Sequence, residues 1–323
     1  MSRRASARSQ ARSRRPSGKQ GAPEPPRRRS CGCLQAHFAL LDRYPEARAN
    51  QAAIEDFVRA AREGRQALRR GVIRIPVVVH VVLRKPTQVT DAQVRRQIER
   101  LNLDFRKQNP DVAKVPAAFR PLVADAKIEF ELARKTPTYR ATKGIRRKKT
   151  SKASFSHVRE DVKDPRTGGL APWDPERYLN LWVCSLEGGT LGYGQFPGGP
   201  PETDGVVILA SAFGSGGSAE APFDLGRTTT HEVGHYLNLS HIWGESRIPS
   251  CQDDDFVPDT PPQFDKNYGT PSFPHVSCHN GPHGDLFMNY MDYVDDEAML
   301  MFTKGQVARM RATLSGPRRR LGA

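Results

Sequence analysis

The chain has 323 residues and a mass of 36.0 kDa, and 37% of its residues are hydrophobic, which is enough for one large or two small folded domains. Its formal net charge is +15, and residues 1–30 supply +9 of it, through ten Arg and Lys residues against Glu24 alone. No apolar run reaches the roughly 18 residues of a membrane-spanning helix, so no transmembrane segment is expected. No apolar signal region of about 7–15 residues follows the basic start either.

Residues 1–30 are rich in Arg, Ser, Gly and Pro and nearly free of apolar side chains, which predicts a disordered basic tail. Such a tail can bind nucleic acid or an anionic membrane through charge alone, and deleting it would then abolish steeply salt-dependent binding. Because no aromatic residues are interleaved, we favour a solvated, removable leader and expect no specific nucleic-acid partner.

Residues 34–70 are predicted to be helical, with apolar residues set among many Ala, Arg and Glu. The Cys31-Gly-Cys33 sequence before them is open to three interpretations: a small redox pair, a metal clip or an unpaired thiol. A thiolate here could also occupy an open position of a metal site in the folded domain and keep that site silent until the segment is removed. We therefore treat residues 31–71 as a propeptide-like segment, with Cys31 as the latency candidate.

The folded domain is expected to begin at about Val72 with a β-branched run, which predicts a central strand starting after Pro76. His80 in this run is expected to be a packed strand residue. Thr90 is predicted to cap an amphipathic helix, whose apolar residues Val94, Ile98, Leu101 and Phe105 follow helical spacing. Further strands are predicted at residues 127–132, 178–186 and 205–210, with Cys184 buried. The order of elements predicts an α/β (α+β) domain, a mixed sheet packed on two helices.

Residues 188–200 are rich in Gly and Pro around the sequence L-G-Y-G-Q. A strand with few side chains on one edge permits another backbone to approach closely. If it borders a catalytic cleft, a peptide substrate could pair with it as an added strand. The alternative is an ordinary exposed edge and loop.

Residues 231–241 read H-E-V-G-H-Y-L-N-L-S-H, and they carry the most specific chemistry in the chain. On a helix, His231 and His235 are one turn apart on the same face, so both imidazoles can bind one cation. For His241 to reach the same ion, the helix must end sharply, and Asn238 suits the left-handed conformation that such an ending requires. Three imidazoles around Zn²⁺ leave a position open for water, as in catalytic zinc sites. The hydroxyls of residues 228–230 suit capping of this helix.

Glu232 lies beside the metal without needing to bind it, which favours a catalytic site over a noncatalytic zinc-containing binding module. A purely structural zinc site has no need of a carboxylate next to its metal. The module remains the alternative interpretation.

Downstream of this helix, residues 251–260 gather six oxygen-bearing side chains, including Asp255 and Thr260, in a loop that could hold Ca²⁺ or could simply be solvated. Cys251 and Cys278 bracket the region, and a disulfide between them would tie the loop down and indicate an oxidising compartment. Residues 289–293 read N-Y-M-D-Y, and M-F-T-K-G-Q at residues 301–306 is expected to open a terminal helix through Met310.

The long zinc sequence followed about fifty residues later by N-Y-M-D-Y resembles the metzincin zinc peptidases, and within them the pappalysin family. The resemblance extends from about Arg29 to Arg318. It includes P-V-V-V-H-V-V at 76–82, L-N-L-W-V-C at 179–184, L-G-Y-G-Q-F-P-G-G-P at 191–200, D-F-V-P-D-T-P at 255–261 and M-F-T-K-G-Q at 301–306.

The resemblance implies a zinc-dependent endopeptidase, with residues 72–323 as its catalytic domain. His231, His235 and His241 match the zinc ligands and Glu232 the general base. Met291 matches the methionine beneath the metal, Tyr293 the tyrosine that approaches the metal or the developing oxyanion, and Cys31 the cysteine of a latent zymogen. The loop matching Asp255 to Thr260 lies near a calcium site in the family.

Two departures from the family pattern are visible. Asn238 stands where most metzincins have Gly, and Thr270 and Ala298 replace a second pair of cysteines. The resemblance and the expected disulfide together imply a secreted, extracellular protein, although no signal peptide is readable, and we expect a monomer acting on peptide or protein substrates. Asp292, Asp295 or Asp296 near the cleft could select basic side chains. The Arg-rich stretch at Arg65, Arg69 and Arg70 is then a candidate self-processing site.

Overall fold

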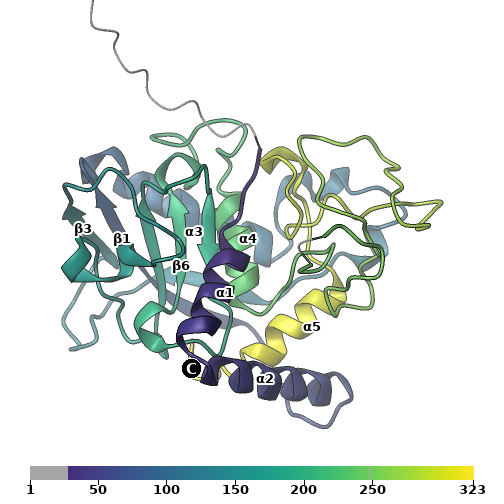
Figure 1. The fold of residues 1–323 in the computed structure, drawn as a ribbon, viewed down its shortest axis with the longest axis horizontal. Helices are drawn as coiled ribbons and strands as arrows, with labels where there is room; N and C mark the ends of the chain where they lie inside the picture. Colours follow the sequence, from purple (N-terminus) through teal and green to yellow (C-terminus); the bar gives the residue numbers. More distant parts are fainter. Residues whose placement is uncertain (1–27, 247) are drawn as a thin grey trace, which may run out of the picture.

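The computed structural model describes residues 28–246 and 248–323, so most of the predicted basic tail, residues 1–27, lies outside the described residues. The described chain forms five α-helices and a six-stranded sheet, and the predicted mixed α/β fold is confirmed (Figure 1). The helices are α1 (Cys33–Arg43), α2 (Glu46–Arg62), α3 (Asp91–Phe105), α4 (Arg227–Tyr236) and α5 (Lys304–Thr313). The strands are β1 (Ile73–Leu83), β2 (Ile128–Leu132), β3 (Ile145–Lys149), β4 (Leu179–Cys184), β5 (Gly192–Gly194) and β6 (Val206–Leu209).

Strand β1 is the centre of the sheet. Its first half pairs in parallel with β2 and its second half with β3, while β4 lies along its other side. The order then continues through β6 to β5, which runs antiparallel to β6 and ends the sheet. The outer edge of β5, which lies next to α4, is therefore available to pair with a further segment.

Two expectations for the strands need correction. Strand β1 begins at Ile73 and not after Pro76. The proline is tolerated inside the strand because β4 pairs with β1 only from Val77 onward, so no β4 carbonyl depends on an N–H group at position 76. Strand β3 was not predicted, since Ile145 is followed by four basic residues. Such residues suit a solvated outer strand.

Helices α3 and α4 connect the sheet to the site. The hydroxyl of Thr90 accepts a hydrogen bond from the Gln93 N–H group, so the predicted cap of α3 is confirmed. The buried face of α3 includes Val94, Leu101 and Phe105, and the helix packs against β2 and α4. Helix α4 in turn packs against β5 and β6 and is buried along its whole length, which fixes its position relative to the sheet edge.

Helices α1 and α2 lie outside the sheet domain. In Figure 1, α1 crosses in front of α4, and α2 lies beside α5. The predicted helical stretch 34–70 is divided at Tyr44 and Pro45, where the chain turns between the two helices, and it ends at Arg62, so residues 63–70 are not helical as expected. Ile54, Val58 and Ala61 of α2 form a small apolar cluster with Ala312 of α5. The segment before Val72 is thus packed against the rest of the molecule at both of its helices.

The described residues between 244 and 303 contain little regular structure, only isolated bridges and one short 3-10 turn. They form the irregular region drawn in yellow-green beside α5 in Figure 1. After α5, the buried guanidinium of Arg318 binds both oxygens of Asp204 at 2.6 and 2.8 Å and the carbonyl of Tyr236 at 2.9 Å. Within the described part of the chain, no helix combines the length and the apolar content needed to cross a bilayer.

Candidate metal centre

Helix α4 carries His231, Glu232 and His235, and it is fixed to α3 through two hydroxyls. Thr229 donates to Gln97 at 2.7 Å and Thr230 donates to Asp104 at 2.8 Å. The expectation that hydroxyls of residues 228–230 cap α4 is therefore wrong, because the N-cap is Gly226, whose φ of 82° permits the tight entry into the helix. The hydroxyls hold the helix in position from the side.

The chain reverses immediately after α4. Asn238 adopts a φ of +75°, as predicted, and the Leu239 N–H group donates to the Gly234 carbonyl at 3.0 Å. The Asn238 carbonyl accepts a 2.5 Å hydrogen bond from the buried Arg309 guanidinium, which holds the turn from the side of α5. This reversal carries His241 back to the face of the helix that presents His231 and His235.

The three imidazoles converge on one point. Nε2 of His235 lies 3.1 Å from Nε2 of His231 and 3.1 Å from Nε2 of His241. Three nitrogens bound to one tetrahedral Zn²⁺ at about 2.0–2.1 Å are about 3.3–3.4 Å apart, so the arrangement fits a shared cation. Had the ring of residue 241 been far from the other two, no shared site would exist.

The opposite ring nitrogens support this orientation. Nδ1 of His231 lies 2.8 Å from the Tyr290 carbonyl, and Nδ1 of His235 lies 2.7 Å from the Leu239 carbonyl. Glu245 approaches Nδ1 of His241 to 3.4 Å. Such partners keep the proton on Nδ1 and turn the Nε2 lone pair toward a metal. Burial lowers the pKa of His231 to about 3, which favours the neutral, ligating form of that ring.

Met291 and Tyr293 come from the irregular region and close the site from the other side. A Cβ placed on Gly234 would lie 2.4 Å from Sδ of Met291, so the buried methionine packs directly against a bare stretch of α4. The Tyr293 ring lies edge-on to His241 with centroids 5.2 Å apart. Trp243 stacks on His241 at 4.4 Å, a contact that sequence reasoning missed. Its position two residues after the last histidine could have indicated a contact with the site.

The segment before α1 runs through the site as an added strand. Leu191 N–H donates to the Ser30 carbonyl and Gly32 N–H donates to the Gly192 carbonyl, each at 2.8 Å, so Cys31 pairs in parallel with Gly192 of β5. The Cys31 sulfur and one ring nitrogen from each of the three histidines all lie within 4.8 Å of one another. The predicted latency residue and the predicted ligands therefore meet in one cluster.

Charge in this cluster is strongly perturbed. Burial would raise the pKa of Cys31, but the Cys33 hydrogen bond and the nearby His235 hold that pKa well below the usual thiol range. Burial, with the Cys31 charge adding to it, raises the pKa of Glu232 well above its ordinary value. The Glu232 side chain is 1% exposed and lies beside the histidine cluster without joining the three ring nitrogens.

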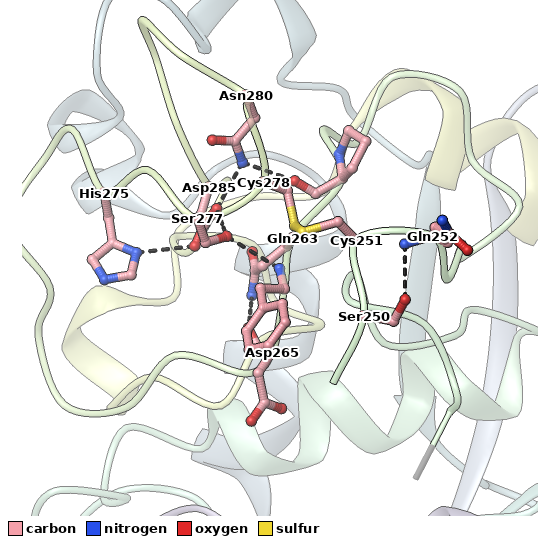
Figure 2. The surroundings of a disulfide bond; sticks show 12 residues. Ser250, Cys251, Gln252, Gln263, Asp265, His275, Ser277, Cys278, Asn280 and Asp285 are labelled. Carbon is pink, nitrogen blue, oxygen red and sulfur yellow. Dashed lines mark hydrogen bonds and ion pairs between the residues drawn. A yellow bond between two sulfur atoms is a disulfide. The ribbon is translucent and has the colours of Figure 1, made fainter. Parts of the chain in front are cut away.

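A disulfide joins Cys251 to Cys278 across 27 residues (Figure 2). Near it, the buried Asp285 carboxylate accepts from Ser277 at 2.6 Å and Asn280 at 2.7 Å, which holds a loop that has no strand or helix. Asp255 binds the Thr260 hydroxyl at 2.7 Å, and its other oxygen has no hydrogen-bond partner among the described residues. A buried carboxylate oxygen without a partner is compatible with a cation ligand.

The three acidic candidates for selecting basic side chains have different surroundings. Asp292 is buried and accepts from Gln263 and Asn267, so it stabilises its own loop. Asp295 begins the short turn that carries Asp296. Asp296 binds the Arg29 guanidinium at 2.6 Å, with both side chains buried.

Arg29 occupies a site shaped for a guanidinium. Its Nη1 donates to Thr228 at 2.9 Å and its Nε to the Val294 carbonyl at 3.0 Å. The ring of Phe223 lies 4.9 Å from the guanidinium carbon. Planar donors, a carboxylate and an aromatic face are the features that bind Arg better than Lys.

These features define a metal site of the peptidase type, and comparison with known proteins agrees. Residues 169–315 match the family model described as pregnancy-associated plasma protein-A. An extracellular metalloprotease of Pyricularia oryzae is 33% identical over 290 residues, covering 87% of this chain and 86% of the relative. An extracellular metalloprotease of Arthroderma otae is 39% identical over 159 residues, covering 41% of this chain.

Solved structures give the same result. Promirolysin of Tannerella forsythia, in a mutant form, matches with a TM-score of 0.81 and 44% identity, covering 91% of this chain and 97% of that one. Mature mirolysin in complex with a cleaved peptide matches with a TM-score of 0.75 and 49% identity, covering 78% and 96%. The chain belongs to the pappalysin family of metallopeptidases. The match spans about half the length of the first curated relatives, 56%, 49% and 50% of them.

Proposed function

We propose that this protein is a zinc-dependent endopeptidase made as a latent precursor. The convergence of three Nε2 atoms beside the buried Glu232 carboxylate is the observation that carries the proposal. A zinc ion held by His231, His235 and His241 would lower the pKa of its water toward about 7 and polarise the scissile carbonyl. A noncatalytic binding module would have no use for Glu232 in this position.

The chain's own residues divide the remaining work. Glu232 takes a proton from the attacking water and delivers it to the leaving amine. The Tyr293 hydroxyl, which now lies 3.2 Å from the Cys31 N–H group, donates to the oxygen that gains charge during attack. The β5 edge, which now pairs with residues 30–32, holds an extended substrate backbone through main-chain hydrogen bonds.

Latency follows from the same contacts. Residues 31–71 act as the pro-segment, Cys31 would bind the metal together with the three histidines, and residues 72–323 form the catalytic domain. Cleavage near Arg65, Arg69 or Arg70 releases the segment. Of these, Arg65 is exposed just after α2, whereas Arg69 is held by carbonyls of the C-terminal residues, including Leu321 at 2.7 Å. We therefore favour Arg65 as the first cut.

A preference for basic side chains is supported by Arg29. Arg29, two residues before Cys31, places its guanidinium against Asp296, and a substrate Arg would take the same place once the residues before the catalytic domain leave. A peptide library cut by the mature protein should show Arg or Lys enriched beside the scissile bond. Asp296→Asn should reduce that enrichment about tenfold or more through loss of the charged partner. A library without enrichment contradicts the preference.

Two further assignments complete the proposal. Asp255 and Thr260 contribute to a Ca²⁺ site, supported by the unpartnered Asp255 oxygen. The disulfide and the extracellular relatives support secretion, and we infer a monomer.

The direct test compares the wild-type precursor with Glu232→Ala, both loaded with zinc. The wild type should convert itself and cleave peptides, with the mature N-terminus near residues 65–70 by N-terminal sequencing. Glu232→Ala should keep its fold and metal content and lose about 10²–10⁴-fold in activity, the usual effect of removing a general base. Equal peptide cleavage by both proteins would contradict the role of Glu232 as general base, and no cleavage by either would leave the binding module as the better interpretation.

A further inference from the structure

The carboxylate of Glu232 is held by the pro-segment through two thiols. Among the described residues, its hydrogen bonds come from Cys33 at 2.9 Å and from Cys31 at 3.4 Å, both ending on Oε2. Both contacts span about 200 positions of sequence and lie in a buried site. The cysteine that faces the histidines is therefore accompanied by a second cysteine, and the second one makes the closer contact with the carboxylate.

Cys33 is fixed in this position from two sides. It is the first residue of α1, and its side chain is fully buried. The Gly194 N–H group of β5 donates to its sulfur at 3.0 Å, so the thiol accepts from the strand and donates to Glu232. A cysteine that only filled apolar space would need neither the Gly194 N–H group nor Glu232 as a partner. The two contacts together orient the S–H bond toward the carboxylate.

Two glycines of β5 make this approach possible. A Cβ on Gly192 would lie 2.9 Å from Cγ of Glu232, and a Cβ on Gly194 would lie 2.5 Å from the Glu232 carbonyl oxygen. Gly32, between the two cysteines, has no room for a Cβ either, since one would lie 2.9 Å from the ring of His157. The close packing of α4, β5 and residues 31–33 therefore depends on residues without side chains.

We propose that Cys33 is a second inhibitory thiol, one that binds the general base while Cys31 blocks the metal. This inference rests on the proposed peptidase function and specifies how the site is silenced. With Cys33 in place, Glu232 cannot accept a proton from water, because its Oε2 already accepts from Cys33 and its side chain is buried. Removing the pro-segment frees the metal and the base in one event.

The experiment uses the full-length, zinc-loaded precursor and isolates Cys33 from Cys31. Cleavage of a fluorogenic peptide is measured as an initial rate, while gels show that the precursor is intact. The variants are Cys31→Ala alone and combined with Cys33→Ala, Cys33→Ser or Cys184→Ala. Cys184 is the matched control, since it is a fully buried thiol on β4 without a hydrogen bond to Glu232.

Adding Cys33→Ala to Cys31→Ala should raise the rate of the intact precursor about 10- to 100-fold, the effect expected from losing a hydrogen bond to a charged group. Cys33→Ser keeps a donor and should stay within about threefold of Cys31→Ala. Cys184→Ala should leave the rate unchanged. If the precursors with alanine and with serine at position 33 cleave the peptide at equal rates, or if neither is faster than Cys31→Ala, the thiol does not restrain Glu232 and the inference is wrong.

Limited proteolysis of the same samples separates this inference from the proposed function. Once the pro-segment is removed, all variants at residues 31 and 33 yield the same mature chain and should have equal activity. An inactive mature protein would contradict the peptidase assignment. Equal mature activity with no difference between precursors would contradict only the role of Cys33.

A readout that does not depend on activity is the infrared S–H stretching band of Cys33 in the precursor, identified by its loss in Cys33→Ala. The band should move to higher frequency in Glu232→Ala, because the thiol loses its acceptor, and should not move in Cys184→Ala. A band that is unchanged in Glu232→Ala shows that the thiol does not donate to the carboxylate and overturns the proposal, even where an alanine variant folds poorly.

Discussion

The sheet with its two inner helices and the described residues between 244 and 303 are stabilised by different interactions. In the first region, β1 and β4 bury almost every side chain, and α4 is buried along its whole length. In the second, a disulfide and buried carboxylates such as Asp285 and Asp292 hold loops with little regular hydrogen bonding. Apolar burial stabilises the first region and also residues 286–302 of the second, which belong to the same buried cluster, whereas the loops before residue 286 depend on polar side chains and the covalent link.

The metal site lies where these two regions meet. Two histidines come from α4, while Met291 and Tyr293 come from the irregular region. The histidines of α4 are thus placed by the sheet region and the covering residues by the irregular region. Substrate-binding surfaces can then vary without moving the metal.

The largest effect is expected in the sheet region. Trp182 is fully buried, stacks on His80 at 4.9 Å and donates to the Leu170 carbonyl at 2.8 Å. Trp182→Ala should lower the free energy of unfolding by about 3–5 kcal/mol, measured by urea denaturation, because it leaves a large cavity. Phe264→Ala, at a half-exposed position of the irregular region, should cost much less. Similar losses for both would erase the contrast between the regions.

The second prediction concerns Asp255 in the irregular region. Burial raises the pKa of Asp255 to about 7, so the folded state holds its proton more tightly than the unfolded state, where the value is about 4. The stability from this group is therefore present below about pH 4 and is lost as pH rises toward 7, by up to about 4 kcal/mol.

Thermal melting from pH 4 to 8 with and without Ca²⁺ measures this effect. Ca²⁺ favours the ionised carboxylate and should restore the stability lost at pH 7 and above. Asp255→Asn should remove both the pH dependence and the Ca²⁺ response of this group. A Ca²⁺ response that survives Asp255→Asn places the cation elsewhere.

The third prediction is local loosening. Replacing both Cys251 and Cys278 with Ala should cost about 3 kcal/mol, because it removes the closure of a loop of 27 residues. Hydrogen exchange should increase in residues 250–285 and stay unchanged in β1 and β4, since Val257 and Cys278 are the only buried apolar residues of that stretch and neither belongs to the sheet core. Loss of protection in β1 would show that this stretch and the sheet unfold as one unit.

The smallest effect is expected at Asn238. Glycine accepts a φ of +75° without strain, so Asn238→Gly should change the melting stability by less than about 1 kcal/mol. The change removes only the 3.0 Å hydrogen bond from the Asn238 side chain to Glu55. A loss above about 2 kcal/mol would mean that this side chain does more than hold the turn.

Sequence reasoning succeeded where a local pattern determines the structure. The spacing of His231 and His235, the turn at Asn238 and the cap of α3 each depend on residues within a few positions of one another. The disulfide was also expected, since Cys251 and Cys278 bracket one loop. In each case the relevant physical constraint is periodicity, backbone conformation or chain length.

The features that were missed depend on distant parts of the chain. Strand β3 is defined by pairing with β1 and not by its own basic sequence. The Arg29 ion pair joins positions 267 residues apart, and the Cys33 bond to Glu232 joins positions 199 apart. No periodicity or propensity records such contacts, because they appear only once the sheet edge and α1 have been placed in space.

The buried Arg318 links the C-terminal residues to the end of helix α4. Its guanidinium lies over the Tyr236 ring at 3.5 Å and binds the Tyr236 carbonyl at the end of α4, one position after His235 of the candidate metal centre. Truncating the protein directly after α5, as one would to obtain a more compact crystallisation sample, would remove the hydrogen bond from Arg318 to the last residue of α4. Such a shortened protein would still bury its sheet, yet it would bind its metal less tightly, so expression trials are best designed to retain Arg318.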